Sequence, residues 1–230
     1  MRALALALAL MLAPGSLPAL TIEGARFEEP TARYDHGILG DALEWAALVI
    51  DTDAGPSRVR LPDHLVFEDL VPRLWDVTGD GLPEVVVVQS HLDLGARLMI
   101  YAAQGDRVRI LAVTPWIGQT HRWLAPVGAT DLDGDGRIEI ALIDRPHLRK
   151  TLQLWRYDGG LRLVAEVGDL TTHRIGDATI AGGVTCDGRG FVTYSGDWSR
   201  VRVTDIDGQR LVTTDAGPNR PGAAEALIDC

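Results

Sequence analysis

The sequence is poor in several residue types, and each shortage limits what the protein can be. Lys150 is the only lysine among 230 residues, so nearly all positive charge is arginine. Acidic residues outnumber lysine and arginine by 32 to 22, which gives a net charge of −10 and a pI near 5.0. A chain with this balance does not attract nucleic acid or an anionic membrane by bulk charge. Nucleic-acid binding is therefore not expected, and the arginines suit carboxylate or phosphate partners instead.

Long apolar runs are missing from all of the chain except its N-terminus. There, Arg2 is followed by the apolar run 3–13, which is too short to span a bilayer and is soon broken by proline and glycine. This pattern is typical of a secretory signal peptide over residues 1–19, with Ala19 as the last residue removed. A retained membrane anchor is the alternative. We expect an exported protein, periplasmic or secreted, without a transmembrane segment after cleavage.

Cysteine is almost absent, since Cys186 and Cys230 are the only two. An even cysteine count in an exported chain favours a disulfide. Such a bond ties the C-terminal tail to the last part of the folded chain. The alternative is two unpaired thiols, with Cys186 buried.

Sequence motifs of catalysis are also missing. The chain has no Gly-x-Ser-x-Gly elbow, no His-Glu-x-x-His zinc motif and no phosphate-binding glycine loop. Helical periodicity of useful length is lacking as well. These absences favour an all-β protein that is not an enzyme.

An internal repeat is the most informative feature that is present. Residues 76–88 read DVTGDGLPEVVVV, and residues 131–143 read DLDGDGRIEIALI. Both segments have Asp at position 1, Gly-Asp-Gly at positions 4 to 6, Glu at position 9 and then a β-branched run. A decayed copy occurs at 183–197, and a weaker one occurs at 40–53, where Glu44 precedes an apolar strand. The chain therefore contains four related units.

Each unit also ends in a hairpin signal, which completes a set of four short strands. Strand–turn–strand patterns occur at 98–113, 152–167 and 201–214, with a cruder version at 59–67. Units of this length, each forming one four-stranded sheet, are typical of a β-propeller. We expect about four blades, over residues 30–67, 68–118, 119–176 and 177–215, in a domain spanning 20–215. A fifth blade built from residues 20–33 and the tail is the alternative, and 216–230 is expected to be an irregular tail.

The acidic loop of the third unit has the spacing of a cation site. Oxygen donors stand at positions 1, 3, 5, 7 and 9: Asp131, Asp133, Asp135, the carbonyl of Arg137, and Glu139. Hard oxygen donors at alternate positions wrap a calcium-sized ion, and the glycine at position 6 permits the turn. The competing explanation is a metal-free loop in which Asp side chains cap their own backbone amides.

The repeated DxDGDGxxE-then-strand pattern resembles the FG-GAP/VCBS repeats of integrin-α-type propellers over roughly residues 30–215. The resemblance implies calcium in the loop between the first two strands of a blade, one or two ions in all. Carried onto the second unit, it implies five ligands: Asp76, Thr78, Asp80, the carbonyl of Leu82, and Glu84. Because Thr78 replaces an acid, this second site has one charge fewer and is expected to be weaker.

A second repeated element is the tripeptide Thr-His-Arg, at 120–122 and 172–174. In a propeller, the strand that follows lines the central channel, so the two copies are expected to gather with other basic residues at one mouth of the ring. The candidate ligand channel comprises Arg33, His36, Arg73, His121, Arg122, His173 and Arg174. Such a cluster favours an anionic ligand or a carboxylate-bearing partner. The alternative is that these residues make hydrogen bonds between blades.

These features together predict an exported, calcium-stabilised, non-catalytic β-propeller. Its expected role is that of an interaction module that binds a protein, a glycan or a small anionic ligand. One alternative is a propeller enzyme, a hydrolase or lyase, with a channel lined by His and Arg. Another is a purely structural component of an envelope complex.

Overall fold

A computed structural model describes residues 20–208 and 210–230, and it is built almost entirely from antiparallel strands. The expected signal peptide, residues 1–19, lies outside the described residues. Within the described ranges the only helix is α1 (Glu225–Ile228), and no helix there is long and apolar enough to cross a membrane. The expected all-β class is confirmed.

The first two units share one eight-stranded sheet. Its strands are β1 (Ile22–Thr31), β2 (Glu44–Thr52), β3 (Ser57–Arg60), β4 (Leu65–Phe67), β5 (Arg73–Trp75), β6 (Glu84–His91), β7 (Gly95–Gln104) and β8 (Arg107–Val113). The short strand β4 joins the two units, because Phe67 pairs with Trp45 of β2 and with Gln89 of β6.

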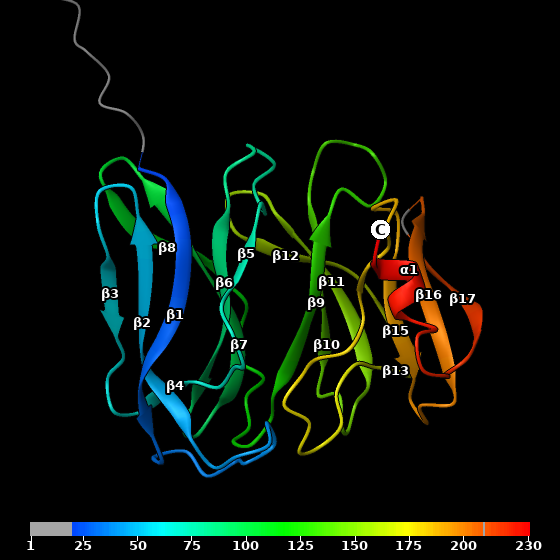
Figure 1. Cartoon of the computed structure of the whole chain (residues 1–230), viewed down its shortest axis with the longest axis horizontal. Helices are drawn as coiled ribbons and strands as arrows, with labels where there is room; N and C mark the ends of the chain where they lie inside the picture. The colour runs from blue at the N-terminus through cyan, green and yellow to red at the C-terminus, as the bar shows by residue number, and fades with distance from the viewer. Residues whose placement is uncertain (1–19, 209) are drawn as a thin grey trace, which may run out of the picture.

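The third and fourth units each have a sheet of their own. The third unit contains β9 (Leu124–Thr130), β10 (Glu139–Asp144), β11 (Thr151–Tyr157) and β12 (Leu161–Val167). The fourth contains β13 (Leu170–Thr171), β14 (Gly183–Val184), β15 (Phe191–Ser195), β16 (Arg200–Asp207) and β17 (Arg210–Pro218). Figure 1 shows the units following one another across the molecule in chain order, from blue to orange.

The strand that follows each acidic loop is buried on both faces. Every residue of β10 is buried, and so is every residue of β6 except His91. A strand with two apolar faces needs cover from both sides, so the units must pack on one another. The largest of the three core clusters therefore crosses between units, and in it Val86 and Ile100 of the second unit join Ile140 of the third and Phe191 of the fourth.

Three of the four expected hairpins are present: β7–β8, β11–β12 and β16–β17. The hairpin expected at 59–67 is wrong. Here β3 and β4 do not pair with each other; both lie along β2, and β4 continues onto β6. The carbonyl of Pro62 accepts the N–H of Leu65, but the chain then continues along β2 in the same direction instead of folding back on β3.

The weak acidic loop expected ahead of Glu44 does not lie with the other acidic loops. The loops at 76–83 and 131–138 are neighbours, since a Cβ on Gly79 would sit 3.4 Å from the carbonyl oxygen of Gly136. The loop that precedes Glu44 instead lies at the opposite edge of the molecule (Figure 1), where Gly176 donates its N–H to Ile38. A short Gly-Asp signal before an apolar strand does not specify at which edge the loop lies, which explains the error.

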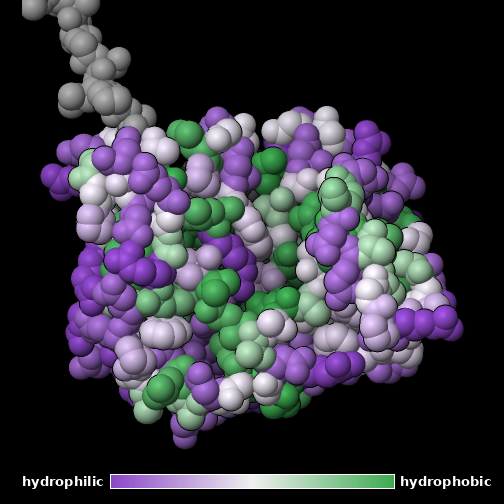
Figure 2. All heavy atoms as spheres, in the orientation of Figure 1, coloured by the Kyte–Doolittle hydropathy of each residue, from purple (hydrophilic) through white to green (hydrophobic). Residues whose placement is uncertain are grey.

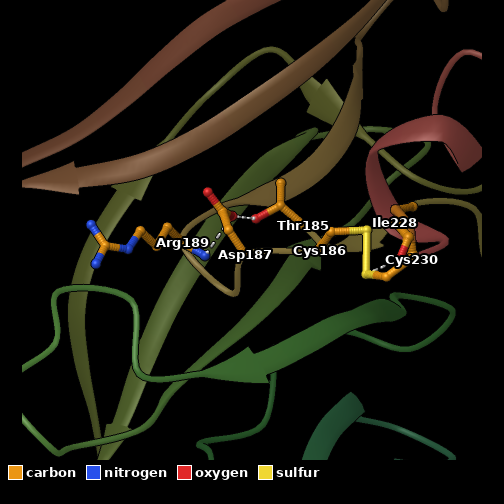
Figure 3. The surroundings of a disulfide bond; sticks show 6 residues. All are labelled: Thr185, Cys186, Asp187, Arg189, Ile228 and Cys230. Atoms are coloured by element: carbon orange, nitrogen blue, oxygen red, sulfur yellow. Dashed lines mark hydrogen bonds between the residues drawn. A yellow bond between two sulfur atoms is a disulfide. The ribbon is translucent and has the colours of Figure 1, made fainter.

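The chain ends fold onto the sheets that precede or follow them. Residues 22–31 pair with β2, and the tail folds against the fourth unit, so the two segments do not form a further sheet together. The tail is also more regular than expected, because β17 extends to Pro218 and α1 follows. Figure 3 shows Cys186 joined to Cys230 in a disulfide beside α1. The N–H of Cys186 also donates to the carbonyl of Leu227, so the tail is attached at two points.

The surface in Figure 2 is hydrophilic over the strands of the first unit, at the left of the view. This purple region matches a network of exposed ion pairs across the face of β1–β3, in which Arg58 contacts Glu28 and Glu29. Hydrophobic residues gather toward the middle of the same face, where the units meet. The polar face of the first unit is therefore a solvated surface, and the candidate sites are at the loops.

Substitution of Gly95 tests the contact between the second and third units. Its φ is +71°, and a Cβ there would lie 2.2 Å from the carbonyl oxygen of Gln119 and 2.8 Å from that of Arg122. Gly105 is a matched control, because its φ is +64° and nothing lies within 4 Å of the same position. We expect Gly95→Ala to lower the free energy of unfolding by about 3 kcal/mol or more, against about 1 kcal/mol for Gly105→Ala. Urea denaturation measures both, and equal losses would contradict the close approach.

Candidate functional site

The acidic loop between β9 and β10 brings three carboxylates together. One oxygen each from Asp131, Asp133 and Glu139 lies within 4.8 Å of the others. Residues 20–208 and 210–230 contain no other such group of three metal-ligating acidic, histidine or cysteine side chains. Glu139 is held in place at the start of β10, where it accepts the N–H of Leu132 at 3.0 Å. The loop is thus tied to the strand it precedes.

Asp131 has one oxygen that no group of the described residues satisfies. Its Oδ2 accepts the N–H of Gly136 at 3.0 Å. Its Oδ1 is shielded from solvent and has no hydrogen-bond partner. A carboxylate oxygen in this position is costly unless a donor or a cation reaches it. The geometry of the loop therefore fits a cation beside Asp131.

Arg156 compensates part of the charge of this loop. It extends from β11, where it pairs across the sheet with Glu139, and its side chain is only 6% exposed. Its guanidinium contacts Glu139 directly and lies 3.3 Å from Asp133 and 3.5 Å from Asp135. Asp135 also accepts hydrogen bonds from Arg137, and these contacts lower the pKa of Asp135 to about 2. Four carboxylates thus face two guanidinium groups. The two negative charges that remain are the charge that one divalent cation would neutralise.

The second acidic loop, between β5 and β6, satisfies itself. Asp76 accepts the N–H groups of Gly79 and Gly81 with its two oxygens, at 2.7 and 2.9 Å. Glu84 accepts the N–H of Val77 at 2.8 Å, just as Glu139 does with Leu132. Burial raises the pKa of Glu84, and no arginine occupies the place that Arg156 holds in the third unit. This loop has the form of the metal-free alternative.

Comparison with known protein families gives one match to this part of the chain. The model of an FG-GAP-like repeat matches residues 76–142, from the start of one acidic loop through the next and into β10. The chain carries an FG-GAP-like repeat. A search of curated proteins finds no match for the sequence. The resemblance inferred from the DxDGDGxxE pattern is therefore confirmed over these residues.

The FG-GAP-like repeat does not bring all the expected metal ligands together. Asp131, Asp133 and Glu139 converge, whereas Asp135 is turned toward Arg137. In the second loop Asp80 accepts the N–H of Leu82, and the carboxylates there do not form a cluster. In the decayed fourth loop, Thr185 donates to Asp187 and so closes the turn (Figure 3).

A second candidate site, the histidine pocket, lies at the edge opposite the acidic loops. It has a volume of about 180 Å³. Its lining comes from the β1–β2 loop, the segment before β9, the β10–β11 loop and the β13–β14 loop: His36, Ile38, His121, Arg122, Trp123, Arg145, Pro146, His147, Leu148 and Ile175. Loops of the first, third and fourth units therefore meet around one cavity.

Only three of the seven residues expected in a ligand channel line this pocket: His36, His121 and Arg122. Four lie elsewhere: Arg33 bonds the carbonyl of Leu65, Arg73 pairs with Asp69, His173 is buried behind His147, and Arg174 stacks on Trp198. The two Thr-His-Arg copies thus have different surroundings. The sequence reasoning missed Trp123, Arg145 and His147. The only sequence signal for Arg145 and His147 is an Arg-Pro-His turn after a buried strand.

A buried carboxyl group holds His36 in the pocket. Its Nδ1 meets the carboxyl of Glu68, which is fully buried and also accepts a hydrogen bond from Ser90. Burial raises the pKa of Glu68 to about 8 and lowers the pKa of His36 to about 4. At neutral pH the proton therefore lies on the Glu68 carboxyl, which donates it to His36 Nδ1. The Nε2–H of His36 remains available as a donor.

His147 is held by a chain of hydrogen bonds that fixes its tautomer. His173 Nε2 lies 2.8 Å from the carbonyl oxygen of Asp177, so it must donate. His173 Nδ1 then accepts from His147 Nε2 at 3.0 Å, which leaves His147 Nδ1 without a proton. Burial and, to a smaller extent, the neighbouring His173 lower the pKa of His147 to about 4. Both rings are neutral at physiological pH.

Arg156 offers a direct test of the acidic loop. We expect Arg156→Gln to lower the free energy of unfolding by about 3–5 kcal/mol, because it leaves the buried Glu139 without its countercharge. Arg162 on β12 is the matched control, since it is exposed and forms no ion pair within the described residues. Arg162→Gln should change stability by less than about 0.5 kcal/mol. Chemical denaturation in chelator measures both variants; a small loss for Arg156→Gln would mean that the ion pair contributes little.

Proposed function

We propose that this chain is an exported, non-catalytic binding module whose sheets form a propeller-like ring stabilised by calcium. The disulfide between Cys186 and Cys230 supports export, because such bonds persist in oxidising compartments. The FG-GAP-like repeat supports an interaction module rather than an isolated catalytic domain. The proposed partner is a protein, a glycan or a small anion that meets the loops at one edge of the ring.

The ring is supported by contacts between the first and last units. Gly176 of the fourth unit donates its N–H to Ile38 of the first at 2.8 Å. A Cβ on Gly40 would lie 3.1 Å from the carbonyl oxygen of Gly176, so the two backbones are in close contact. This contact of the first unit with the last, together with the core cluster shared by the second, third and fourth units, supports a closed arrangement of the series.

The observation that best supports calcium binding is Oδ1 of Asp131, which is buried and has no hydrogen-bond partner among the described residues. Asp131, Asp133 and Glu139 would hold the ion, and hard carboxylate oxygens are the donors that calcium prefers. The ion would supply positive charge to the buried oxygen and cross-link the loop to β10. Thr130, next to Asp131, donates to the carbonyl of Gly188 in the fourth unit at 2.8 Å. A fixed Asp131 loop therefore also fixes the junction of the third and fourth units.

Calcium should raise the melting temperature of the purified chain by roughly 5–10 °C at saturation, and chelator should reverse the effect. Asp131→Asn should abolish the response, because it removes the charge of the orphaned carboxylate. Asp76→Asn is the matched control: it alters the same position of the self-satisfied second loop and should leave the response intact. Differential scanning calorimetry with and without calcium measures all three proteins. A wild-type chain that does not respond to calcium would refute the metal site.

A second candidate function has one observation in its favour. The Glu68 carboxyl orients His36 in an open pocket with its Nε2–H as a donor, and a neutral imidazole that polarises a substrate carbonyl is a known catalytic device. We nonetheless expect no turnover of ester, peptide or glycoside substrates, because the described pocket lining contains no Ser, Thr or Cys nucleophile and no Asp or Glu carboxylate. Turnover that is lost in both His36→Ala and His121→Ala would show that the pocket is catalytic and would overturn the binding-module proposal.

A further inference from the structure

The histidine pocket contains one positive charge that the chain does not neutralise. Arg122 is partly buried, and its Nη1 donates to the carbonyl of the adjacent His121 at 2.8 Å. No carboxylate of the described residues lies within ion-pair distance of it. The other arginine of the pocket, Arg145, is held by Asp144 through two hydrogen bonds of 2.9 Å. Arg122 is therefore the group that a ligand's negative charge would meet.

Two imidazoles of the pocket add hydrogen-bonding capacity without adding charge. His36 and His147 are neutral at physiological pH, since burial lowers the pKa of each to about 4. His36 offers its Nε2–H, and His121 stacks against His36 at 5.1 Å between ring centroids. Asp35, the acid nearest to His121, lies 3.2 Å from it with a side chain that is 90% exposed. The pocket thus has the charge balance of a site for a single anion.

The rest of the lining is apolar. Trp123, Ile38 and Pro146 form a buried floor, and Trp123 is fixed because its Nε1–H donates to the carbonyl of Glu68 at 2.8 Å. At the rim, Leu148 is 64% and Ile175 is 69% exposed. Large apolar side chains left in solvent around a concave site are typical of ligand-binding surfaces.

The size of the cavity limits the ligand. Its volume is about 180 Å³. Cavities of about 150 Å³ accept benzene in other proteins, so there is room for one ring-sized group and little more. We propose that the histidine pocket binds an apolar monocarboxylate, with the carboxylate on Arg122 and a ring-sized body over Trp123. This inference rests on the proposed binding function and names its ligand class.

A carboxylate beside a ring-sized apolar group occurs in two sources, a free aromatic acid and the C-terminal residue of a peptide. Isothermal titration calorimetry of the full chain in calcium separates them. One arm uses phenylpropionate with phenylpropionamide as its neutral analogue. The other uses a short glycine peptide that ends in phenylalanine, with a free or an amidated C-terminus. We expect at least one acid to bind about tenfold or more tightly than its amide, because only the acid pairs with Arg122.

Variants of the pocket make the test specific. Arg122→Gln should weaken binding of the acid about tenfold or more, and Ile175→Glu, which places an acid at the rim, should do the same. Arg174→Gln is the matched control: it changes the same position of the other Thr-His-Arg copy, which lies outside the pocket. It should alter binding less than about twofold. Because Ile175 is exposed, its variant keeps the test valid even if Arg122→Gln unfolds.

The possible outcomes are separable. Charge-selective binding that is lost in Arg122→Gln and Ile175→Glu supports the inference, and the arm in which it occurs identifies the source. Equal binding of acids and amides, equal loss in Arg174→Gln, or no binding in either arm would overturn it. None of these results decides whether calcium stabilises the fold or whether the pocket turns over a substrate, since those properties are read by melting and by turnover.

Discussion

The strands that are buried on both faces are the constraint from which the rest of the structure follows. A single four-stranded sheet cannot bury β6 or β10, because each of these strands presents apolar side chains above and below its sheet. The sheets of neighbouring units supply the missing cover, and the shared core passes through the second, third and fourth units. The packing of sheet on sheet then places the loops of successive units side by side at two edges. One edge carries the acidic loops, and the other carries the histidine pocket.

Local patterns in the sequence predicted local structure well. The Asp-Gly turns of the hairpins and the Gly-Asp-Gly loops ahead of Glu84 and Glu139 need only a few consecutive residues to be specified, and the structure has them where they were expected. The position of the acidic loop in the first unit was predicted wrongly. Its sequence signal was equally short, but pairing with strands outside that signal decides where the loop lies. Glu44 begins a buried strand, β2, just as Glu84 begins β6. However, β4 pairs with the start of β2 and with the end of β6, so the first residues of β2 lie near the end of β6. No sequence pattern near Glu44 indicates that pairing.

The same difference separates the site residues that the sequence predicted from those that it did not. Spacing along the chain placed Asp131, Asp133 and Glu139 together, because a nine-residue loop leaves little freedom. Spacing gave no indication of Arg156, which reaches the loop from the next strand through the cross-strand register. It also gave no indication of His147, whose partner His173 is 26 residues away in the β13–β14 loop. Residues that act through pairing between strands or between sheets become visible only when the register is known.

The strand β9 connects the two candidate sites. Trp123 and the pocket precede its first residue, and Asp131 follows its last, so the sites lie roughly 20–25 Å apart at the ends of one seven-residue strand. Because β9 also contacts β6, β7, β14 and β15, it has little freedom to shift within the core. A cation bound at the Asp131 loop would add to this restraint at one end of β9, and Arg122 and Trp123 stand at the other end. Allosteric coupling would require a second arrangement of this strand, and its packing against these neighbours argues against one.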